Sequence, residues 1–152
     1  MIKKSIKIGN KIIGGSSTFI IADIGSNHMQ DISLAKESIL AAVESGVDAV
    51  KFQSIQLDKL YFNPDSQTSN FVKKLEFPEH WHQELNNFCK KLKITFFSSP
   101  TYLDAIRLLE EIEVPLYKIA SAQIGVFPQL IERVAALNKP TLFSTGIINN
   151  VE

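Results

Sequence analysis

The stretch Leu116-Tyr117-Lys118-Ile119-Ala120-Ser121-Ala122-Gln123 decides the fold that this sequence predicts. It has the length and apolar character of a short buried strand, yet it carries one lysine and ends in small polar residues. The same design occurs earlier, at Asp48-Ala49-Val50-Lys51-Phe52-Gln53-Ser54. A lysine inside an apolar strand is costly unless a negative group compensates its charge. The two strands therefore predict one anionic ligand held between Lys51 and Lys118.

Short apolar segments of this kind alternate with amphipathic helical patterns along the chain. Segments that are apolar without alternating in polarity are typical of parallel strands covered on both faces. The alternation therefore predicts an α/β fold with a parallel sheet, preceded by a small hairpin on the Gly9-Asn10 turn. We predict strands at residues 6–8 and 11–13 in the hairpin and at 19–24, 47–53, 94–98, 116–120 and 141–144 in the sheet, and helices at 33–45, after Pro78, at 102–112 and from Pro128.

One long connection interrupts this alternation. Residues 56–77 are rich in Asn, Ser, Gln and Pro, and they follow the second strand of the predicted sheet. Long loops of this kind are functional or disordered, and a loop after a strand lies on the ligand-binding side of a barrel or an open sheet. Just beyond it, His80 and His82 flank Trp81, and we predict that both are solvated and point to different faces of a helix.

Composition excludes several classes of protein. The 152 residues carry 16 basic and 16 acidic side chains with no basic block, which argues against a nucleic-acid partner. No apolar stretch approaches the roughly 20 residues that span a membrane, so no membrane partner is expected. A single cysteine, Cys89, excludes an internal disulfide and is expected to fill the core. These observations predict a cytoplasmic protein of one domain.

Polar side chains gather where the predicted strands end. Lys51 and Gln53 share one face of their strand, because side chains alternate. In a barrel the strand ends converge on one mouth, where lysines and hydroxyls make a receptor for phosphate or carboxylate. Each residue also has an ordinary explanation, since a lone lysine can reach solvent and serines can cap helices. The other candidates at these ends are Asp23, Asn27, His28, Ser98, Ser99, Lys118, Ser121, Gln123 and Ser144.

Five motifs occur in order along the chain and span nearly all of it after residue 17. They are Phe19-Ile20-Ile21-Ala22-Asp23-Ile24-Gly25-Ser26-Asn27-His28, Ala49-Val50-Lys51-Phe52-Gln53, Phe97-Ser98-Ser99-Pro100, Tyr117-Lys118-Ile119-Ala120-Ser121 and Lys139-Pro140-Thr141-Leu142-Phe143-Ser144-Thr145-Gly146. One motif alone would be weak, but together the five resemble the sialic acid synthase family, which includes the N-acylneuraminate, legionaminate and pseudaminate synthases.

The resemblance implies a TIM (β/α)8 barrel, of which this chain holds about the first five strand-helix units after the hairpin. Residues 1–152 would be the N-terminal portion of a single synthase barrel domain, without its C-terminal half and without an antifreeze-like domain. It implies the condensation of phosphoenolpyruvate with an N-acyl hexosamine, giving a nine-carbon 2-keto acid and phosphate. We expect a homodimer for the full-length protein and no activity from residues 1–152 alone.

The same resemblance implies roles for individual residues. The residues that match the family's phosphoenolpyruvate contacts are Lys51, Ser99, Lys118, Ser121 and Ser144, whereas Gln53 matches a sugar contact and Asp23 a catalytic carboxylate. Asn27 and His28 match the end of the first motif, and we count Asn27 and Gln123 among the substrate-binding residues. The family's divalent metal, Mn or Mg, has its ligands beyond residue 152, so we expect no metal ligand in this chain.

Two positions depart from the family pattern, and they leave other functions open. Asp23 and Gln123 both stand where the family usually has glutamate. Aspartate has a shorter reach, and glutamine cannot act as a base. One alternative is a barrel aldolase that forms a Schiff base through Lys118, which would need a lowered pKa in a dry site. The other is a non-catalytic binding or assembly protein built on a degenerate half barrel.

Overall fold

The computed structural model describes residues 5–16 and 18–146. An antiparallel hairpin opens this part of the chain, and strands and helices then alternate as the sequence predicts. The elements are β1 (Ile6–Ile8), β2 (Lys11–Ile13), β3 (Ile21–Gly25), α1 (Ile32–Glu44), β4 (Ala49–Ser54), α2 (Leu57–Leu60), α3 (Ser66–Lys73), α4 (Glu79–Leu92), β5 (Thr95–Pro100), α5 (Leu103–Glu111), β6 (Tyr117–Ile119), α6 (Ser121–Ile124), α7 (Pro128–Ala135) and β7 (Thr141–Phe143).

The strands after the hairpin pair in parallel, in the order of the chain. β3, β4 and β5 form one ladder, and β6 and β7 form a second. Gln53 of β4 stands opposite Ser99 of β5 in the register. Paired residues of neighbouring parallel strands point to the same face, so this register carries the polar positions of β4 and β5 to one side. The predicted α/β class with parallel strands is confirmed.

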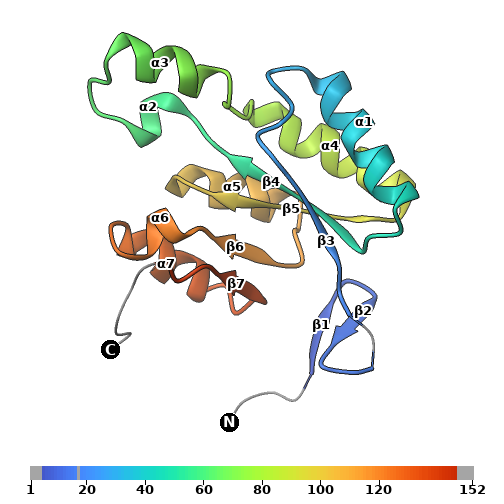
Figure 1. Ribbon diagram of the computed structural model, residues 1–152. Helices are drawn as coiled ribbons and strands as arrows, with labels where there is room; N and C mark the ends of the chain where they lie inside the picture. Colours follow the sequence, from blue (N-terminus) through green and yellow to red (C-terminus); the bar gives the residue numbers. More distant parts are fainter. Residues whose placement is uncertain (1–4, 17, 147–152) are drawn as a thin grey trace.

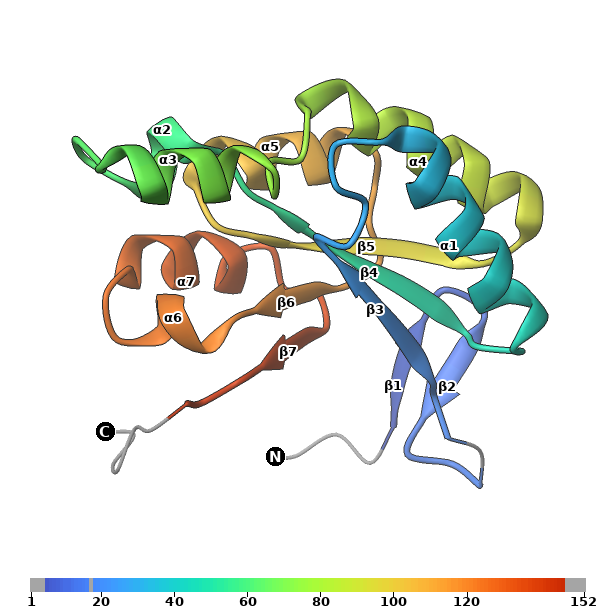
Figure 2. The ribbon, with the colours of Figure 1, turned by 45° about the horizontal axis from the view of Figure 1, so that its top comes forward.

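Helices and connections are divided between the two ends of the strands. Helices α1, α4 and α5 lie over β3, β4 and β5 in both views (Figures 1 and 2). α2, α3 and α6 gather at the end where β4 and β6 finish, whereas the β1–β2 hairpin lies at the opposite end (Figure 2). The C-terminal ends of the strands therefore share one side of the molecule, which is where active sites lie in barrel enzymes.

The face of β4 and β5 that the helices cover holds an aromatic core. The rings of Phe52 and Phe96 stack with centroids 5.7 Å apart, and Phe77 packs against Phe52 at 5.5 Å. The ring of Trp81, from α4, lies edge-on to Phe77 at 5.7 Å. Buried aromatic side chains contribute most per residue to a core, and such pairs add about 0.5–1.5 kcal/mol each. This layer therefore fixes α4 against the back of the two strands.

The hairpin is tied to the N-terminal ends of the strands by one carboxylate. Asp48 precedes β4, accepts a hydrogen bond of 2.8 Å from the backbone N–H of Ile20, and forms an ion pair of 3.1 Å with Lys11 of β2. The N–H of Ile20 and then the ammonium of Lys11 hold the pKa of Asp48 below its usual value. Asp48 therefore links the hairpin, β3 and β4 at the end away from the candidate site.

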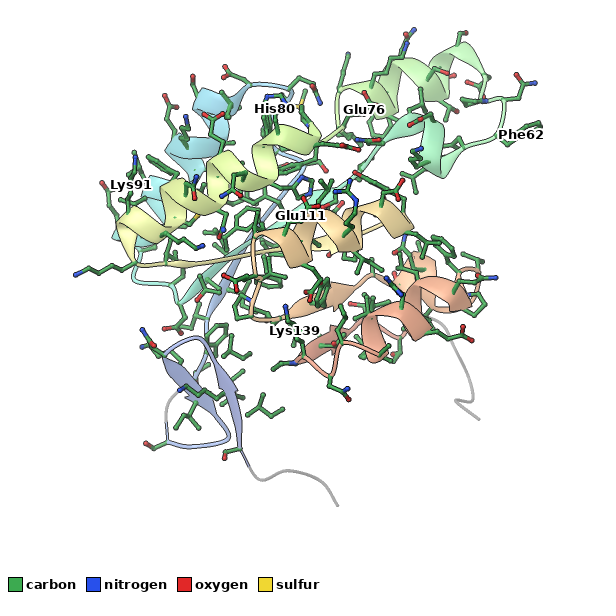
Figure 3. All side chains as sticks on the ribbon, turned by 180° about the vertical axis from the view of Figure 1, so that it is seen from behind. Phe62, Glu76, His80, Lys91, Glu111 and Lys139 are labelled. Atoms are coloured by element: carbon green, nitrogen blue, oxygen red, sulfur yellow. The ribbon has the colours of Figure 1, made fainter. Side chains whose placement is uncertain are left out.

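Two sequence expectations were wrong, and both lie around the long connection. Residues 56–77 contain two helices, α2 and α3, where a loop was predicted. α3 has little apolar character, but the side chain of Asp65 caps it by accepting from the N–H of Thr68 at 2.7 Å. Phe62, between α2 and α3, is fully exposed at the outer end of this segment (Figure 3).

The second wrong expectation concerns His82, which was predicted to be solvated. Its side chain is only 1 % exposed, since α4 turns it toward β4. Its ring lies edge-on to Phe77 at 4.7 Å, and both of its nitrogens have hydrogen-bond partners. His80, two residues earlier, is exposed as predicted (Figure 3).

The single cysteine and the length of the helices were also considered in the sequence predictions. Cys89 is fully buried in α4, as predicted, and burial raises the pKa of its thiol to about 12. None of the helices in residues 5–16 and 18–146 combines the length and the apolar character that a bilayer crossing requires.

Candidate active site at the carboxyl ends of the strands

Lys51 is the buried cation of the site, and its partner is Asp23. The Lys51 side chain is 7 % exposed, and its Nζ lies 2.7 Å from Oδ1 of Asp23 on the neighbouring strand. The register pairs these two residues directly, so the contact follows from the parallel alignment of β3 and β4. Asp23 is 60 % exposed, so its carboxylate contacts both the buried ammonium of Lys51 and the solvent. A buried lysine needs such a partner.

Lys118 is the second lysine of the site, and it lies on β6 as Lys51 lies on β4. Its Nζ donates to the hydroxyl of Ser144, just after β7, and to the carbonyl of Ile119 at 3.0 Å. Its neighbours Tyr117 and Ile119 are fully buried, and the hydroxyl of Tyr117 donates to Glu110 of α5 at 2.7 Å. Since side chains alternate along a strand, Lys118 points to the face opposite these helices.

The charges of the two lysines influence each other across the strands. Burial, and then the positive charge of Lys51, lower the pKa of Lys118, while the carboxylate of Asp23 partly offsets this. The convergence of Lys51 and Lys118 at one side of the strands stays a prediction. Two ammonium groups and one carboxylate at that side would leave a net positive charge, which favours an anionic ligand.

Gln53 and Ser99 lie beside this pair, on the same face of β4 and β5. Ser99 is 1 % exposed, and its hydroxyl has no hydrogen-bond partner among the described residues. A buried hydroxyl without a partner is costly, so a ligand that supplied one would be favoured there. Gly25, with φ of +59°, follows Asp23; a Cβ at Gly25 would lie 3.4 Å from Oδ1 of Asp23 and 3.9 Å from Nε2 of Gln53. Asp23 and Gln53 therefore border the same small space.

Ser121 and Gly146 border the space next to Lys118. Ser121 is exposed at the start of α6, and Ser144 is half-buried. Gly146 has φ of +60°, and a Cβ there would lie only 3.1 Å from the Cβ of Ser121. No role was predicted for Gly25 or Gly146 from the sequence, although each stands a few residues after a strand-end polar group, which is where backbone often approaches a ligand.

Three predicted residues have no side-chain hydrogen bond or ion pair with this cluster in the described residues. Asn27 is exposed in the turn after β3, and His28 is fully buried among Phe52, Phe77 and Trp81 on the helix side. Burial lowers the pKa of His28, so it is a neutral ring in the core. Gln123 is also buried, and its side-chain oxygen has no partner among the described residues.

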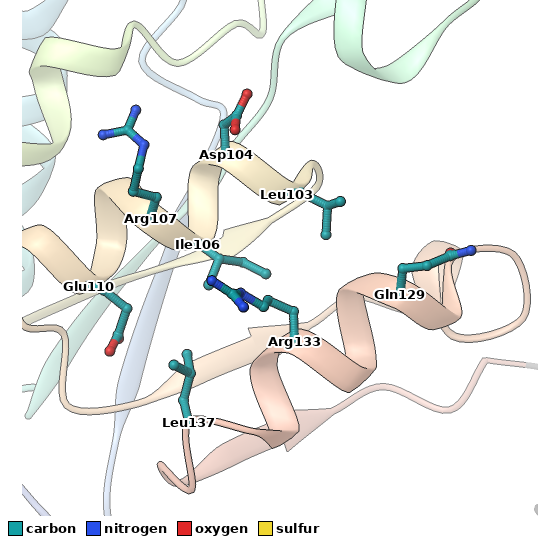
Figure 4. Close-up of a pocket in the computed structure, with 8 residues that line it drawn as sticks. All are labelled: Leu103, Asp104, Ile106, Arg107, Glu110, Gln129, Arg133 and Leu137. Atoms are coloured by element: carbon teal, nitrogen blue, oxygen red, sulfur yellow. The ribbon is translucent and has the colours of Figure 1, made fainter.

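The residues that the structure describes do not form a metal site. They contain no group of three His, Cys, Asp or Glu side chains placed to hold an ion. A groove of about 550 Å³ lies elsewhere, between α5 and α7, on the outer side of the helices (Figure 4). Its charged lining is Asp104, Arg107, Glu110 and Arg133, so the two signs are balanced, and none of these residues belongs to the strand-end cluster.

Comparison with known proteins places this chain in a family. The sequence profile of the NeuB family matches residues 38–152, which is most of the chain. The chain belongs to the NeuB family. The pseudaminic acid synthase of Helicobacter pylori is 38% identical over 148 residues, covering 88% of this chain and 43% of that protein. The N,N'-diacetyllegionaminic acid synthase of Campylobacter jejuni is 38% identical over 146 residues, covering 87% of this chain and 43% of that protein.

A solved structure of a NeuB-like synthase supports the fold. The N-acetylneuraminic acid (sialic acid) synthetase of Leptospira borgpetersenii, in complex with citrate, superposes with a TM-score of 0.87 at 33% identity. The match covers 95% of this chain and 50% of that one. The predicted family and the predicted partial TIM barrel are therefore confirmed. The chain spans less than half the length of the two curated relatives just described.

Proposed function

We propose that this chain supplies the phosphoenolpyruvate-binding part of a sialic acid-type synthase. Such an enzyme condenses phosphoenolpyruvate with an N-acyl hexosamine to a nine-carbon 2-keto acid and phosphate. The observation that carries the proposal is the buried ammonium of Lys51, held 2.7 Å from the exposed carboxylate of Asp23 beside the unpartnered buried hydroxyl of Ser99. Phosphoenolpyruvate has two anionic groups, so two ammonium groups and several hydroxyls offset the cost of removing it from water.

The proposed roles come from the resemblance to the family, and the position of each side chain is compatible with its role. Lys51 and Lys118 bind the phosphate and the carboxylate, and the hydroxyls of Ser99, Ser121 and Ser144 are the further donors. Gln53 binds the sugar from the same face of β4. The C2–C3 π electrons of phosphoenolpyruvate form the bond from C3 to the aldehyde carbon, whose C=O π bond breaks so that its oxygen takes up a proton. Water adds at C2 and loses one proton, and the bond from C2 to the phosphate oxygen then breaks as the remaining C2 hydroxyl loses its proton and becomes the ketone. Asp23, half open to solvent beside Lys51, can accept the proton of that water.

The described residues do not fit a metal ion, so the proposal assigns them no step that uses one. The resemblance predicts that the Mn or Mg ligands lie beyond residue 152. The cytoplasmic location and the homodimer of the full-length protein also remain predictions. The role of Gln123 is also a proposal: its unpartnered buried oxygen could turn to a sugar hydroxyl, but an amide cannot replace a glutamate as a base.

Calorimetric titration of the chain with phosphoenolpyruvate tests the proposal. We expect saturable binding that weakens with salt, and weaker binding of pyruvate or inorganic phosphate, because each lacks one of the two anionic groups. We also expect no release of phosphate when N-acetylmannosamine and manganese are added to residues 1–152. Failure of phosphoenolpyruvate to bind any better than inorganic phosphate would refute the proposal.

The lowered pKa of Lys118 favours one second candidate, an aldolase that forms a Schiff base. Sodium borohydride added with pyruvate would trap such an adduct and raise the mass of the chain. The synthase forms no covalent bond to lysine, so we expect an unchanged mass.

A further inference from the structure

A buried chain of hydrogen bonds lies directly behind the candidate site. On the helix-covered face, the hydroxyl of Ser54 lies 2.8 Å from Nε2 of His82 and 2.8 Å from the hydroxyl of Ser98. The hydroxyl of Thr101 donates to the carbonyl of Ser54 at 2.7 Å. Ser54 and Ser98 are 0% exposed, His82 is 1%, and Thr101 is 8%. No substrate can reach these groups, so they cannot be catalytic residues.

The partners determine the direction of every hydrogen bond in this chain. Nδ1 of His82 lies 2.9 Å from the carbonyl of Glu79, which can only accept, so Nδ1 carries the proton. Burial lowers the pKa of His82 although Glu79 opposes the shift, so the ring is neutral and its Nε2 is an acceptor. Ser54 must then donate to Nε2, and Ser98 must donate to Ser54. The direction of each of these hydrogen bonds is therefore set by the tautomer of His82.

The network occupies the same level of the strands as two proposed ligand contacts. Ser54 follows Gln53 on β4, and Ser98 precedes Ser99 on β5. Gln53 and Ser99 are register partners, and the alternation of side chains turns them to the opposite face. The bond between Ser54 and Ser98 joins the two strands from behind, and His82 joins them to α4. Any displacement of Ser54 or Ser98 therefore moves the backbone that carries Gln53 or Ser99.

We propose that His82, Ser54, Ser98 and Thr101 form a positioning network that holds Gln53 and Ser99 in place for the ligand. The identity of that ligand rests on the proposed function. That the network holds the strand ends in place does not depend on the proposed function. Catalytic and binding groups lose much of their effect when they shift by about 1 Å, so a support of this kind has a measurable consequence.

Two variants and one control test the network. Thr101→Val keeps the shape of the side chain and removes its hydrogen bond to Ser54. Ser54→Ala removes the bonds to both His82 and Ser98. Asn86→Ala is the control: Asn86 lies on the same helix as His82 and is 5% exposed, and its amide donates at 3.1 Å to the carbonyl of Ile112, which ends α5 and is not part of the network. All three changes remove buried hydrogen bonds, and are therefore expected to lower stability.

The first readout needs no ligand. Amide hydrogen exchange is measured by mass spectrometry for peptides that cover residues 53–55 and 98–101. We expect exchange there to accelerate by about tenfold or more in Ser54→Ala and Thr101→Val, and to stay close to wild type in Asn86→Ala, because opening is local. Equal acceleration in all three variants, or none in the two network variants, would overturn the proposal.

The second readout is the affinity for phosphoenolpyruvate, measured by calorimetry well below the melting temperature of the least stable variant. We expect the dissociation constant to rise about tenfold in the two network variants and to stay unchanged in Asn86→Ala. If wild type binds and the network variants bind equally well, the positioning role is wrong. If wild type itself does not bind, the proposed function is wrong, and hydrogen exchange alone then decides whether the network holds the strand ends.

Discussion

Replacing Lys118 by methionine is expected to weaken phosphoenolpyruvate binding while leaving the fold intact. Lysine has three N–H donors, and the hydroxyl of Ser144 and the carbonyl of Ile119 occupy two of them. One donor is therefore available for a ligand, and a single hydrogen bond to a charged group contributes about 1.5–3 kcal/mol. At about 1.4 kcal/mol for each tenfold change, we expect Lys118→Met to raise the dissociation constant about 10- to 100-fold.

Calorimetric titration measures this change, and Lys91→Met is the matched control. Lys91 is an exposed residue of α4 on the outer side of the molecule, and its loss removes the same unit of charge (Figure 3). The control separates a specific contact from a general decrease in positive charge. A dissociation constant for Lys118→Met within about twofold of the control, equivalent to about 0.4 kcal/mol, would refute the assignment of Lys118 to the ligand.

The stability of the same variant should depend on pH in a defined direction. Burial and the charge of Lys51 lower the pKa of folded Lys118 from the value of 10.5 that describes the unfolded chain. Between these two pKa values the unfolded chain binds more protons, so stability rises with pH through that window. The charge on Lys118 therefore destabilises the fold below the window. We expect Lys118→Met to melt above wild type at neutral pH, with a difference that shrinks toward pH 10.5; a constant difference would contradict this.

Three further predictions concern other parts of the chain. Cys89, with a pKa raised to about 12 by burial, should resist alkylation by iodoacetamide at neutral pH in the folded state and react only in denaturant; rapid modification of folded protein would show that α4 opens. Gly146→Ala should weaken phosphoenolpyruvate binding in calorimetry, because the positive φ costs about 1–2 kcal/mol and the new Cβ would lie 3.1 Å from that of Ser121; wild-type affinity would remove Ser121 from the site. Leu109→Ala, at a fully buried position, should lower the free energy of unfolding in urea by about 2–5 kcal/mol, and a loss below about 1 kcal/mol would mean that the core collapses around the gap.

The order of strands and helices could be predicted from the sequence because each apolar segment is short and separated from the next by a helical pattern. The boundaries moved by one or two residues, as in β3, which ends at Gly25 rather than at residue 24. The placement of Lys51 and Lys118 on two parallel strands, β4 and β6, could also be predicted, because both lie in short apolar segments of the chain.

The features that were missed depend on contacts between distant segments. α3 is polar, so periodicity could not reveal it, although Asp65 three residues before Thr68 is a capping signal. The burial of His82 depends on a hydrogen bond with Ser54, which lies 28 residues earlier in the sequence. A second stripe on α4, formed by His82, Asn86 and Cys89 at spacings of four and three, would have indicated a wider buried face.

Alternate residues of β4 serve two different purposes, packing against the helices and facing the candidate site. Phe52 and Ser54 belong to the packed layer behind the sheet, whereas Lys51 and Gln53 contribute little to that layer. If Gln53 contacts the sugar as proposed, its exchange in a gene copy would change the preferred sugar without a large loss of folding stability. Drift in substrate choice among homologous enzymes would then leave its trace at position 53, whereas Lys51 and the even-numbered positions behind the sheet would stay constant.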